Sequence, residues 1–165
     1  METHTLRDAT AADVPAIREI YNYYVLNSTC TYQLEPDTLA EREAWFGAHS
    51  PERYPVVVVE SEGRVVGWGS LSKFHPREGY APTAEASVYI AADHHRRGLG
   101  KMILAHLIER ARAIGFHTLI GGTSAEQAAS LALQEGLGFQ RVGLMREVAR
   151  KFGQRLDVVT MQLML

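Results

Sequence analysis

Glycine and basic residues are concentrated in one short stretch of the sequence, and this combination is suited to binding an anion. The stretch consists of Arg96, Arg97, Gly98, Leu99, Gly100 and Lys101. Glycine lets a ligand approach the backbone closely, and the first N–H groups of a helix have no partner within the helix. Together with the positive end of the helix dipole and the cationic side chains, these groups predict a phosphate-binding site.

The flanking residues predict that this stretch joins a strand to a helix. Residues 87–90 are β-branched or aromatic in character, as strands are. From residue 99 onward, apolar side chains recur every three or four positions, which is typical of one buried helix face. They are Leu99, Ile103, Leu107, Ala111 and Ile114. The same composition also fits a solvated connection with no ligand.

Spacing excludes two nucleotide-binding motifs for this turn. A P-loop needs a hydroxyl residue directly after its lysine, whereas Met102 follows Lys101. A Rossmann turn needs a third glycine, which the sequence from Gly98 onward lacks.

Composition indicates one globular domain over residues 1–165, with 46% hydrophobic and 22% charged residues. The net charge of −2 points to neither a nucleic-acid nor a membrane partner. No apolar run has the length of a membrane span, and the first residues do not read as a signal peptide. The single cysteine, Cys30, fits a reducing cytoplasm and is interpreted as a small structural residue. No metal site is expected, because adjacent histidines such as His94 and His95 rarely face one ion.

The order of elements predicts a mixed α/β (α+β) sheet with helices on its faces. Strands are expected at residues 6–9, 54–60, 65–71, 85–91, 116–121, 139–148 and 156–164, and helices at 10–25, 38–46, 99–115 and 126–135. Thr10 and Thr38 are expected to cap the first two helices.

Several motifs in register resemble one known family. Residues 95–100 are similar to the pyrophosphate loop of the GCN5-related N-acetyltransferases (GNAT), Gln/Arg-x-x-Gly-x-Gly/Ala, with His95 at its first position. Further motifs resemble the phosphinothricin N-acetyltransferases and their relatives that acetylate methionine sulfone or sulfoximine. They are Ser28-Thr29 with Glu35-Pro36, Arg53–Pro55, Thr83–Tyr89, Glu135–Phe139, Gly143–Arg146, and Lys151–Gly153 with Asp157. Three positions depart from the pattern: Gln127 replaces Asn, Gln134 replaces His and Arg155 replaces Trp.

The resemblance implies a GNAT acyl-CoA N-acyltransferase fold, a central twisted and mostly antiparallel sheet flanked by helices, with acetyl-CoA as the cofactor. It implies that the turn at residues 96–101 binds the cofactor together with Val88, Tyr89, Ile90, Gln127 and Ser130. Main-chain groups of residues 88–90 would pair with the pantetheine amides, whereas their side chains fit an ordinary core. For Ser130, a plain helix-surface serine is the alternative interpretation.

The resemblance also implies the residues that bind the substrate. They are Tyr32, His75, Pro76, Arg77, Glu85, Ala86, Ser87 and Lys151. Arg77 could pair with a substrate carboxylate, although arginines are also common in surface loops. Glu85 is the expected general base, with a solvated strand-end acid as the alternative. No residue is assigned as the acid that protonates the leaving thiolate.

The sequence therefore predicts an N-acetyltransferase acting on the α-amine of a small amino-acid-like substrate, of the phosphinothricin or methionine sulfone/sulfoximine type. Transfer would be direct, in a ternary complex. One alternative acetylates a protein or peptide N-terminus, which requires an open groove. Another is a non-catalytic acyl-CoA-binding sensor, suggested by Gln134 and by the absence of tyrosine from residues 126–139. The resemblance also implies a homodimer, and the apolar strand at residues 158–165 fits either the interface or the core.

Overall fold

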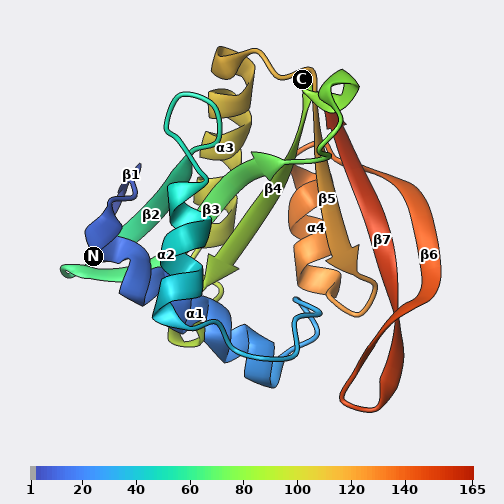
Figure 1. Cartoon of the computed structure of the whole chain (residues 1–165), viewed down its shortest axis with the longest axis horizontal. Helices are drawn as coiled ribbons and strands as arrows, with labels where there is room; N and C mark the ends of the chain where they lie inside the picture. The colour runs from blue at the N-terminus through green and yellow to red at the C-terminus, as the bar shows by residue number, and fades with distance from the viewer. Residues whose placement is uncertain (1–2) are drawn as a thin grey trace.

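A seven-stranded sheet forms the centre of the computed structural model, which describes residues 3–165 (Figure 1). Its strand order is β1-β2-β3-β4-β5-β7-β6. The strands are β1 (His4–Asp8), β2 (Val56–Ser61), β3 (Arg64–Lys73), β4 (Thr83–Ile90), β5 (Thr118–Ser124), β6 (Gln140–Lys151) and β7 (Gln154–Met164). Among the strands of residues 3–165, only β4 and β5 pair in parallel. The predicted mixed, mostly antiparallel sheet is confirmed.

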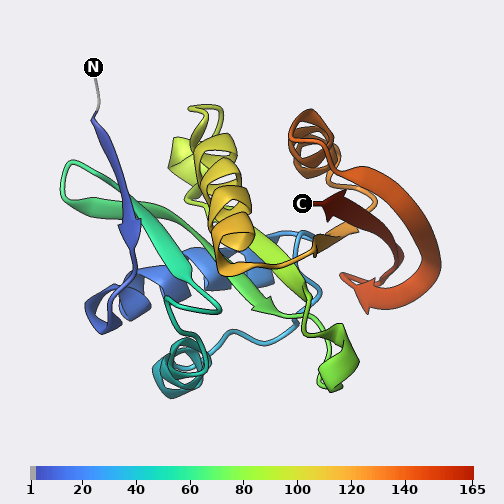
Figure 2. The ribbon, with the colours of Figure 1, turned by 90° about the horizontal axis from the view of Figure 1, so that it is seen from above.

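Helices cover both faces of this sheet (Figure 2). Helices α1 (Val14–Asn27) and α2 (Leu39–Gly47) lie on one face, and α3 (Leu99–Ile114) and α4 (Ala128–Gly136) lie on the other. Short 3-10 turns occur at Ala11–Asp13, Glu78–Tyr80 and Ala92–His94. The predicted order of helices and strands is confirmed. None of the helices within residues 3–165 is long and apolar enough to cross a membrane.

Local contacts explain where two of the helices begin. The Thr38 hydroxyl accepts a hydrogen bond from the Glu41 backbone N–H, and Glu41 bonds back to Thr38, so the predicted N-cap of α2 is confirmed. Helix α4 begins at Ala128, two residues later than predicted. Glu126 and Gln127 instead hydrogen-bond the side chain of Thr29, 2.9 and 3.1 Å away, and Gln127 has a non-helical ψ of 68°. These tertiary contacts hold both residues outside the helix.

Helix α3 carries the buried face that the sequence predicts. Leu99, Ile103, Leu107 and Ala111 are all at most 2% exposed. The helix packs closely on β3 because Gly69 has no side chain: a Cβ at that position would collide with Ile103 and with the Ser87 carbonyl oxygen. This close packing places the first turn of α3 beside the end of β4.

The pairing between β4 and β5 ends early, and this opens the sheet. The two strands pair only from Thr83 to Glu85 on β4, opposite Thr118 to Ile120 on β5. Beyond that point they diverge, as Figure 1 shows. From Ala86 onward, the edge of β4 that faces β5 therefore has no strand partner. A gap opens beside residues 86–90, next to the start of α3.

Candidate active site

Two cavities adjoin β4 and meet along it. The first, of about 640 Å³, is bordered by β3, α2 and residues 29–33; we call it the β3-side cavity. The second, of about 520 Å³, is bordered by the start of α3, by α4 and by β5; we call it the α3-side cavity. Glu85, Ser87 and Tyr89 line both cavities, whereas Ala86, Val88 and Ile90 line only the second. This alternation follows from the two-residue period of a strand.

The α3-side cavity brings together most of the residues predicted to bind the cofactor. Those that line it are Val88, Tyr89, Ile90, Arg96, Gly98, Leu99, Gly100, Gln127 and Ser130. Arg97 and Lys101 are exposed and do not line it. Leu104, Leu133 and Phe139 add apolar walls. The cavity thus combines an apolar channel with an anion-binding turn.

The turn itself has the backbone geometry that the sequence predicts for close ligand approach. Gly98 precedes the first residue of α3 and has a φ of +77°, and Arg96 also has a left-handed φ, of +62°. Such a φ favours glycine and is costly for arginine, so this turn is strained. The first N–H groups of α3 have no acceptor within the helix. They and the helix dipole favour an anion at this point.

Two of the residues that depart from the family pattern have defined structural contacts. The amide nitrogen of Gln134 donates to the Thr123 hydroxyl, 2.7 Å away, and Gln134 is 8% exposed. The amide nitrogen of Gln127 donates to the Thr29 hydroxyl, 3.1 Å away. Both residues line the α3-side cavity while their NH₂ groups bond within the protein. The third departure, Arg155, lies exposed on β7, 3.6 Å from Glu147.

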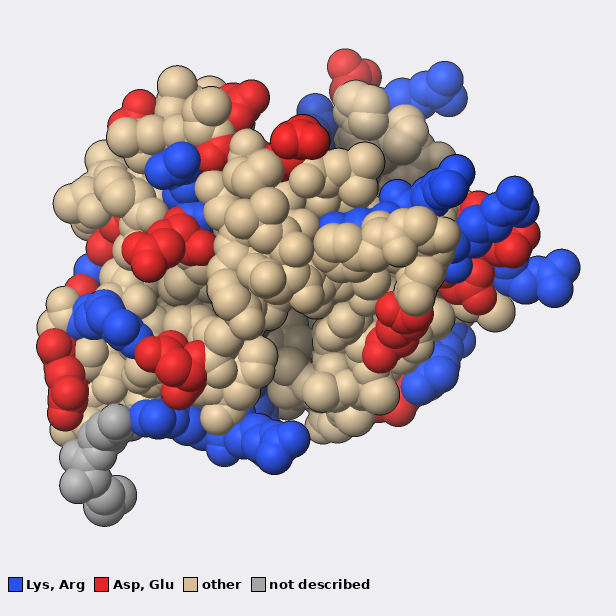
Figure 3. All heavy atoms as spheres, turned by 90° about the horizontal axis from the view of Figure 1, so that it is seen from below, with Lys and Arg blue, Asp and Glu red and all other residues tan. Residues whose placement is uncertain are grey.

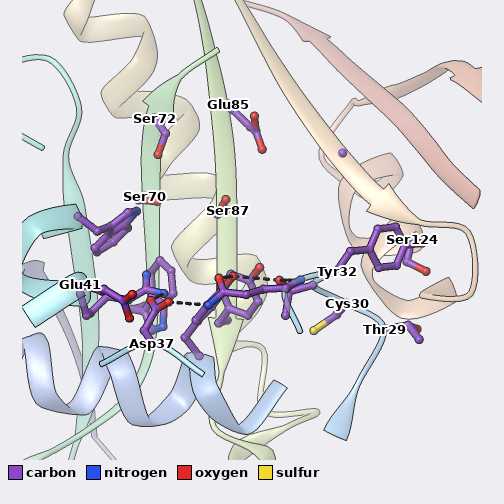
Figure 4. A pocket seen from close by; sticks show the side chains of 18 of the residues that line it. Thr29, Cys30, Tyr32, Asp37, Glu41, Ser70, Ser72, Glu85, Ser87 and Ser124 are labelled. Carbon is purple, nitrogen blue, oxygen red and sulfur yellow. Dashed lines mark hydrogen bonds and ion pairs between the residues drawn. The ribbon is translucent and has the colours of Figure 1, made fainter. Parts of the chain in front are cut away.

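The floor of the β3-side cavity is built from facing residues on two strands. Three pairs stand opposite each other on β3 and β4: Trp68 with Tyr89, Ser70 with Ser87, and Ser72 with Glu85. All six line this cavity. Figure 4 shows Ser70 and Ser72 on one strand beside Ser87 and Glu85 on the next. Polar groups therefore occupy the part of the cavity nearest Glu85.

An arginine fixes one wall of the β3-side cavity. The Arg42 guanidinium forms an ion pair with Asp37 and lies 4.1 Å from the ring centre of Tyr21 and 4.7 Å from that of Trp45. Arg42 is only 4% exposed, so its charge is compensated inside the protein. This part of the wall is consequently aromatic, with the charges of Arg42 and Asp37 paired.

Glu85 lies where the two cavities meet. No hydrogen bond to its carboxyl group is formed by any residue in the described range 3–165, and burial raises the pKa of Glu85 above its ordinary value. A carboxylate with a raised pKa and open access to a cavity is a suitable general base near neutral pH.

The other residues predicted to bind the substrate are distributed differently. Tyr32 lines the β3-side cavity, and its hydroxyl donates to the Asp157 carbonyl oxygen, 2.6 Å away. Residues 75–77 border neither cavity. Lys151 also borders neither; it is 3% exposed, and its ammonium group donates to the carbonyl oxygens of Thr31 and Tyr24. For Lys151 and for residues 75–77, a substrate role stays a prediction.

Sequence reasoning missed several residues that line the cavities. Among them are Tyr24, Arg42, Trp68, Ser70 and Ser72. Tyr24 donates its hydroxyl proton to the Ile90 carbonyl oxygen and lies within hydrogen-bond distance of His95. Alternating serines in an otherwise apolar strand were a usable signal for β3. No signal in the sequence brings α1 and α2 to β4.

Figure 3 shows a hollow bordered mainly by uncharged residues, with basic side chains close to one side of it. Within residues 3–165, no group of three or more His, Cys, Asp or Glu is arranged to hold a metal ion.

Comparison with known proteins identifies the family. The model of the acetyltransferase (GNAT) domain matches residues 6–160. An L-methionine sulfoximine/L-methionine sulfone acetyltransferase from Pseudomonas paraeruginosa is 43% identical over 160 residues, which cover 96% of this chain and 93% of the relative. The L-amino acid N-acyltransferase MnaT of Escherichia coli is 39% identical over 161 residues, covering 98% and 94%.

Solved structures agree with these sequence relatives. The crystal structure of a GNAT superfamily phosphinothricin acetyltransferase from Sinorhizobium meliloti, in complex with acetyl-CoA, matches with a TM-score of 0.95 and 38% identity, over 99% of this chain and 89% of that one. The chain therefore belongs to the GNAT family and is an N-acetyltransferase. Within the family its relatives include phosphinothricin and methionine sulfone acetyltransferases, as the motifs predict.

The raised pKa of Glu85 predicts how this residue affects stability. Because the folded protein holds the Glu85 proton more tightly than the unfolded chain, its free energy of unfolding falls as pH rises above the ordinary value of 4.5. We expect Glu85→Gln to gain stability relative to the wild type as pH is raised from about 4 to about 8. Urea unfolding across this range measures the difference. Glu43→Gln, on the exposed side of α2, controls for the lost charge. Parallel wild-type and Glu85→Gln curves would contradict the prediction.

Proposed function

We propose that this N-acetyltransferase moves an acetyl group from acetyl-CoA to the α-amine of a small amino-acid-like substrate. Phosphinothricin, methionine sulfone and methionine sulfoximine are the types that its relatives suggest. The observation that carries the proposal is the junction of two cavities at Glu85. One cavity begins at an anion-binding turn, and the other is lined by polar and aromatic side chains.

The α-amine would enter the β3-side cavity, and acetyl-CoA would be held by the α3-side cavity. The turn at residues 96–101 suits its phosphates, and the edge of β4 left without a partner after Glu85 suits its amides. Acetyl-CoA supplies an activated acetyl group when bound. The Ile90 carbonyl oxygen already accepts a hydrogen bond from Tyr24, and the register directs the main-chain groups of Tyr89 to Trp68 of β3, so we assign the main-chain contacts first to Val88.

Glu85 would accept the proton of the substrate ammonium, which makes the amine nucleophilic. Direct transfer in a ternary complex fits the site because both cavities open onto this residue. Cys30 also lines both, but burial raises the pKa of its thiol and disfavours the thiolate that an acyl-enzyme would require. The site thus supports a general base more than a covalent nucleophile.

The names of the sequence relatives favour a small amine over a peptide. Residues 29–33 and α2 border the β3-side cavity beside β3 and β4. An assay with acetyl-CoA and a panel of amino acids, methionine sulfone, phosphinothricin and short peptides, following free thiol, tests this. Turnover with peptides alone would contradict the small-substrate proposal. CoA binding without any turnover would favour a sensor.

Replacing Glu85 by glutamine tests the base directly. Glutamine keeps the shape and hydrogen-bonding capacity but cannot accept the proton, so we expect turnover at neutral pH to fall about 10²–10⁴-fold with CoA binding retained. Part of the deficit should return as pH rises, following the titration of the amine. Turnover within about threefold of the wild type would show that Glu85 is not the base. Loss at every pH would indicate a role in holding the substrate or the fold.

Gly100→Val tests the assignment of the anion-binding turn. A branched side chain at this position would crowd the approach to the first turn of α3, and its Cβ would lie 3.2 Å from Leu133 Cδ2. We expect weaker CoA binding in isothermal titration. Gly47→Val is a matched control, since Gly47 ends α2, is exposed and has no atom within 4 Å of a built Cβ. Unchanged CoA affinity in a folded Gly100→Val protein would overturn the assignment.

We also propose a homodimer, formed through β6. This strand lies at the edge of the sheet, and large apolar side chains on and beside it are 50–58% exposed: Val142, Leu144, Met145, Val148 and Phe152. In the C-terminal strand β7, by contrast, Val159, Met161 and Leu163 are buried, so the core accounts for its apolar character. Exposed apolar side chains gathered on an edge strand suit contact with a second copy of the chain.

Light scattering tests the proposed dimer. The wild type is expected to have the mass of two chains, and Leu144→Glu to shift toward one chain because it places a charge in the apolar surface. Leu26→Glu on α1 is the control, since Leu26 is 57% exposed but lies far from β6 in the sequence and on a different element. A monomeric wild type, or an unaltered mass for Leu144→Glu, would refute an interface at β6.

A further inference from the structure

A histidine outside both cavities holds one of the serines on the floor of the β3-side cavity. His49, which follows α2, has its Nε2 atom 3.0 Å from the Ser72 hydroxyl oxygen and its Nδ1 atom 2.7 Å from the Trp45 carbonyl oxygen. Its ring lies against the Trp45 ring, with centroids 4.4 Å apart. Ser72 therefore has a fixed partner that does not line the cavity.

The donor and acceptor roles in this chain of hydrogen bonds follow from chemistry. A carbonyl oxygen can only accept, so Nδ1 of His49 carries the proton that points at Trp45. In the neutral imidazole, Nε2 then has only a lone pair. Burial lowers the pKa of His49, which favours this neutral form. The Ser72 hydroxyl must consequently donate its one proton to His49.

This arrangement determines what Ser72 presents to the cavity. Its proton is directed at His49, so only the oxygen lone pairs are available on the open side. Ser72 lines the β3-side cavity directly opposite Glu85 in the β3–β4 register, and Figure 4 shows the two side chains on neighbouring strands beside the same space. Directly opposite residues in antiparallel strands have Cβ atoms about 4.5–5.5 Å apart. Two hydrogen-bond acceptors therefore border one small volume.

We propose that Ser72, oriented by His49, is a second acceptor for the substrate ammonium and positions the amine against Glu85; this rests on the function proposed above. An ammonium group has three N–H donors, and two acceptors on adjacent strands would fix its nitrogen more firmly than one carboxylate. One proton passes from the nitrogen to the Glu85 carboxylate. Ser72 and His49 keep their own protons and continue to hold the resulting amine through a remaining N–H. His49 is thus a positioning residue that acts through Ser72.

Steady-state kinetics with the amine found active in the panel assay test the inference. Ser72→Ala is expected to raise the KM for the amine by about 10- to 100-fold, the loss typical of a hydrogen bond to a charged group, with kcat and CoA affinity close to wild type. Ser72→Thr keeps the hydroxyl and should stay within about threefold of wild type. Ser61→Ala removes a buried serine from β2 that lines neither cavity, and serves as the matched control.

His49→Phe tests whether His49 acts by orienting the Ser72 hydroxyl and not merely by packing against Trp45. Phenylalanine keeps a ring against Trp45 but offers Ser72 no acceptor, so the hydroxyl is free to turn its proton toward the cavity. We expect the KM of His49→Phe for the amine to rise by about the same factor as that of Ser72→Ala. The double variant Ser72→Ala with His49→Phe should show no further rise in KM, because the two residues act as one unit. Additive effects, or an unchanged KM in Ser72→Ala, would overturn the proposal. If His49→Phe does not fold, the contrast between Ser72→Ala and Ser72→Thr decides it.

The same experiment distinguishes failure of the proposed function from failure of the proposed role of Ser72 and His49. A wild-type protein without turnover on any amine would mean that the proposed function fails. A wild type that turns over, together with a Ser72→Ala variant that keeps the wild-type KM, would mean that only the role of Ser72 and His49 fails.

Discussion

The site depends on the point at which β4 stops pairing with β5. An inner strand of a sheet normally forms backbone hydrogen bonds along both of its edges. Here the parallel pairing of β4 with β5 ends at Glu85 and Ile120. The rest of β4 keeps β3 on one edge and has no strand on the other. This arrangement separates the strands and leaves a partly exposed strand in the centre of the molecule, with residues 85–90 all of intermediate burial. Both cavities, and the junction between them, follow from it.

The packing around this gap keeps it open without destabilising the fold. Helix α3 buries its apolar face on the sheet, with Ile103 and Leu107 fully buried, so that the anion-binding turn before it is held in place. On the other face, Arg42 and Asp37 neutralise each other beneath an aromatic wall. Lys151 donates to the backbone of α1 and of the segment after it. Buried charges thus fix the segments that border the β3-side cavity, and the groups at its floor remain available to a ligand.

Two of the residues that depart from the family pattern, Gln127 and Gln134, form hydrogen bonds within the protein. Gln134 bonds Thr123 and so connects α4 to β5, and Gln127 bonds Thr29 and so connects the start of α4 to the segment after α1. Each amide satisfies a polar partner close to the α3-side cavity. Both contacts lie beside the α3-side cavity and tie α4 to neighbouring segments.

Much of this protein is determined by local sequence. The period of apolar residues in α3, the capping residues of α2 and the glycines of the turn are local signals, and the element order and the anion-binding turn follow from them. Motifs in register indicated the family, and most of the residues predicted from them to bind the cofactor line the α3-side cavity. The β3-side cavity was not predictable in this way. Ser72 and Glu85 become neighbours only through strand register, and His49 reaches Ser72 only because the end of α2 packs on β3. Contacts between residues far apart in the chain depend on tertiary packing, which local patterns do not encode.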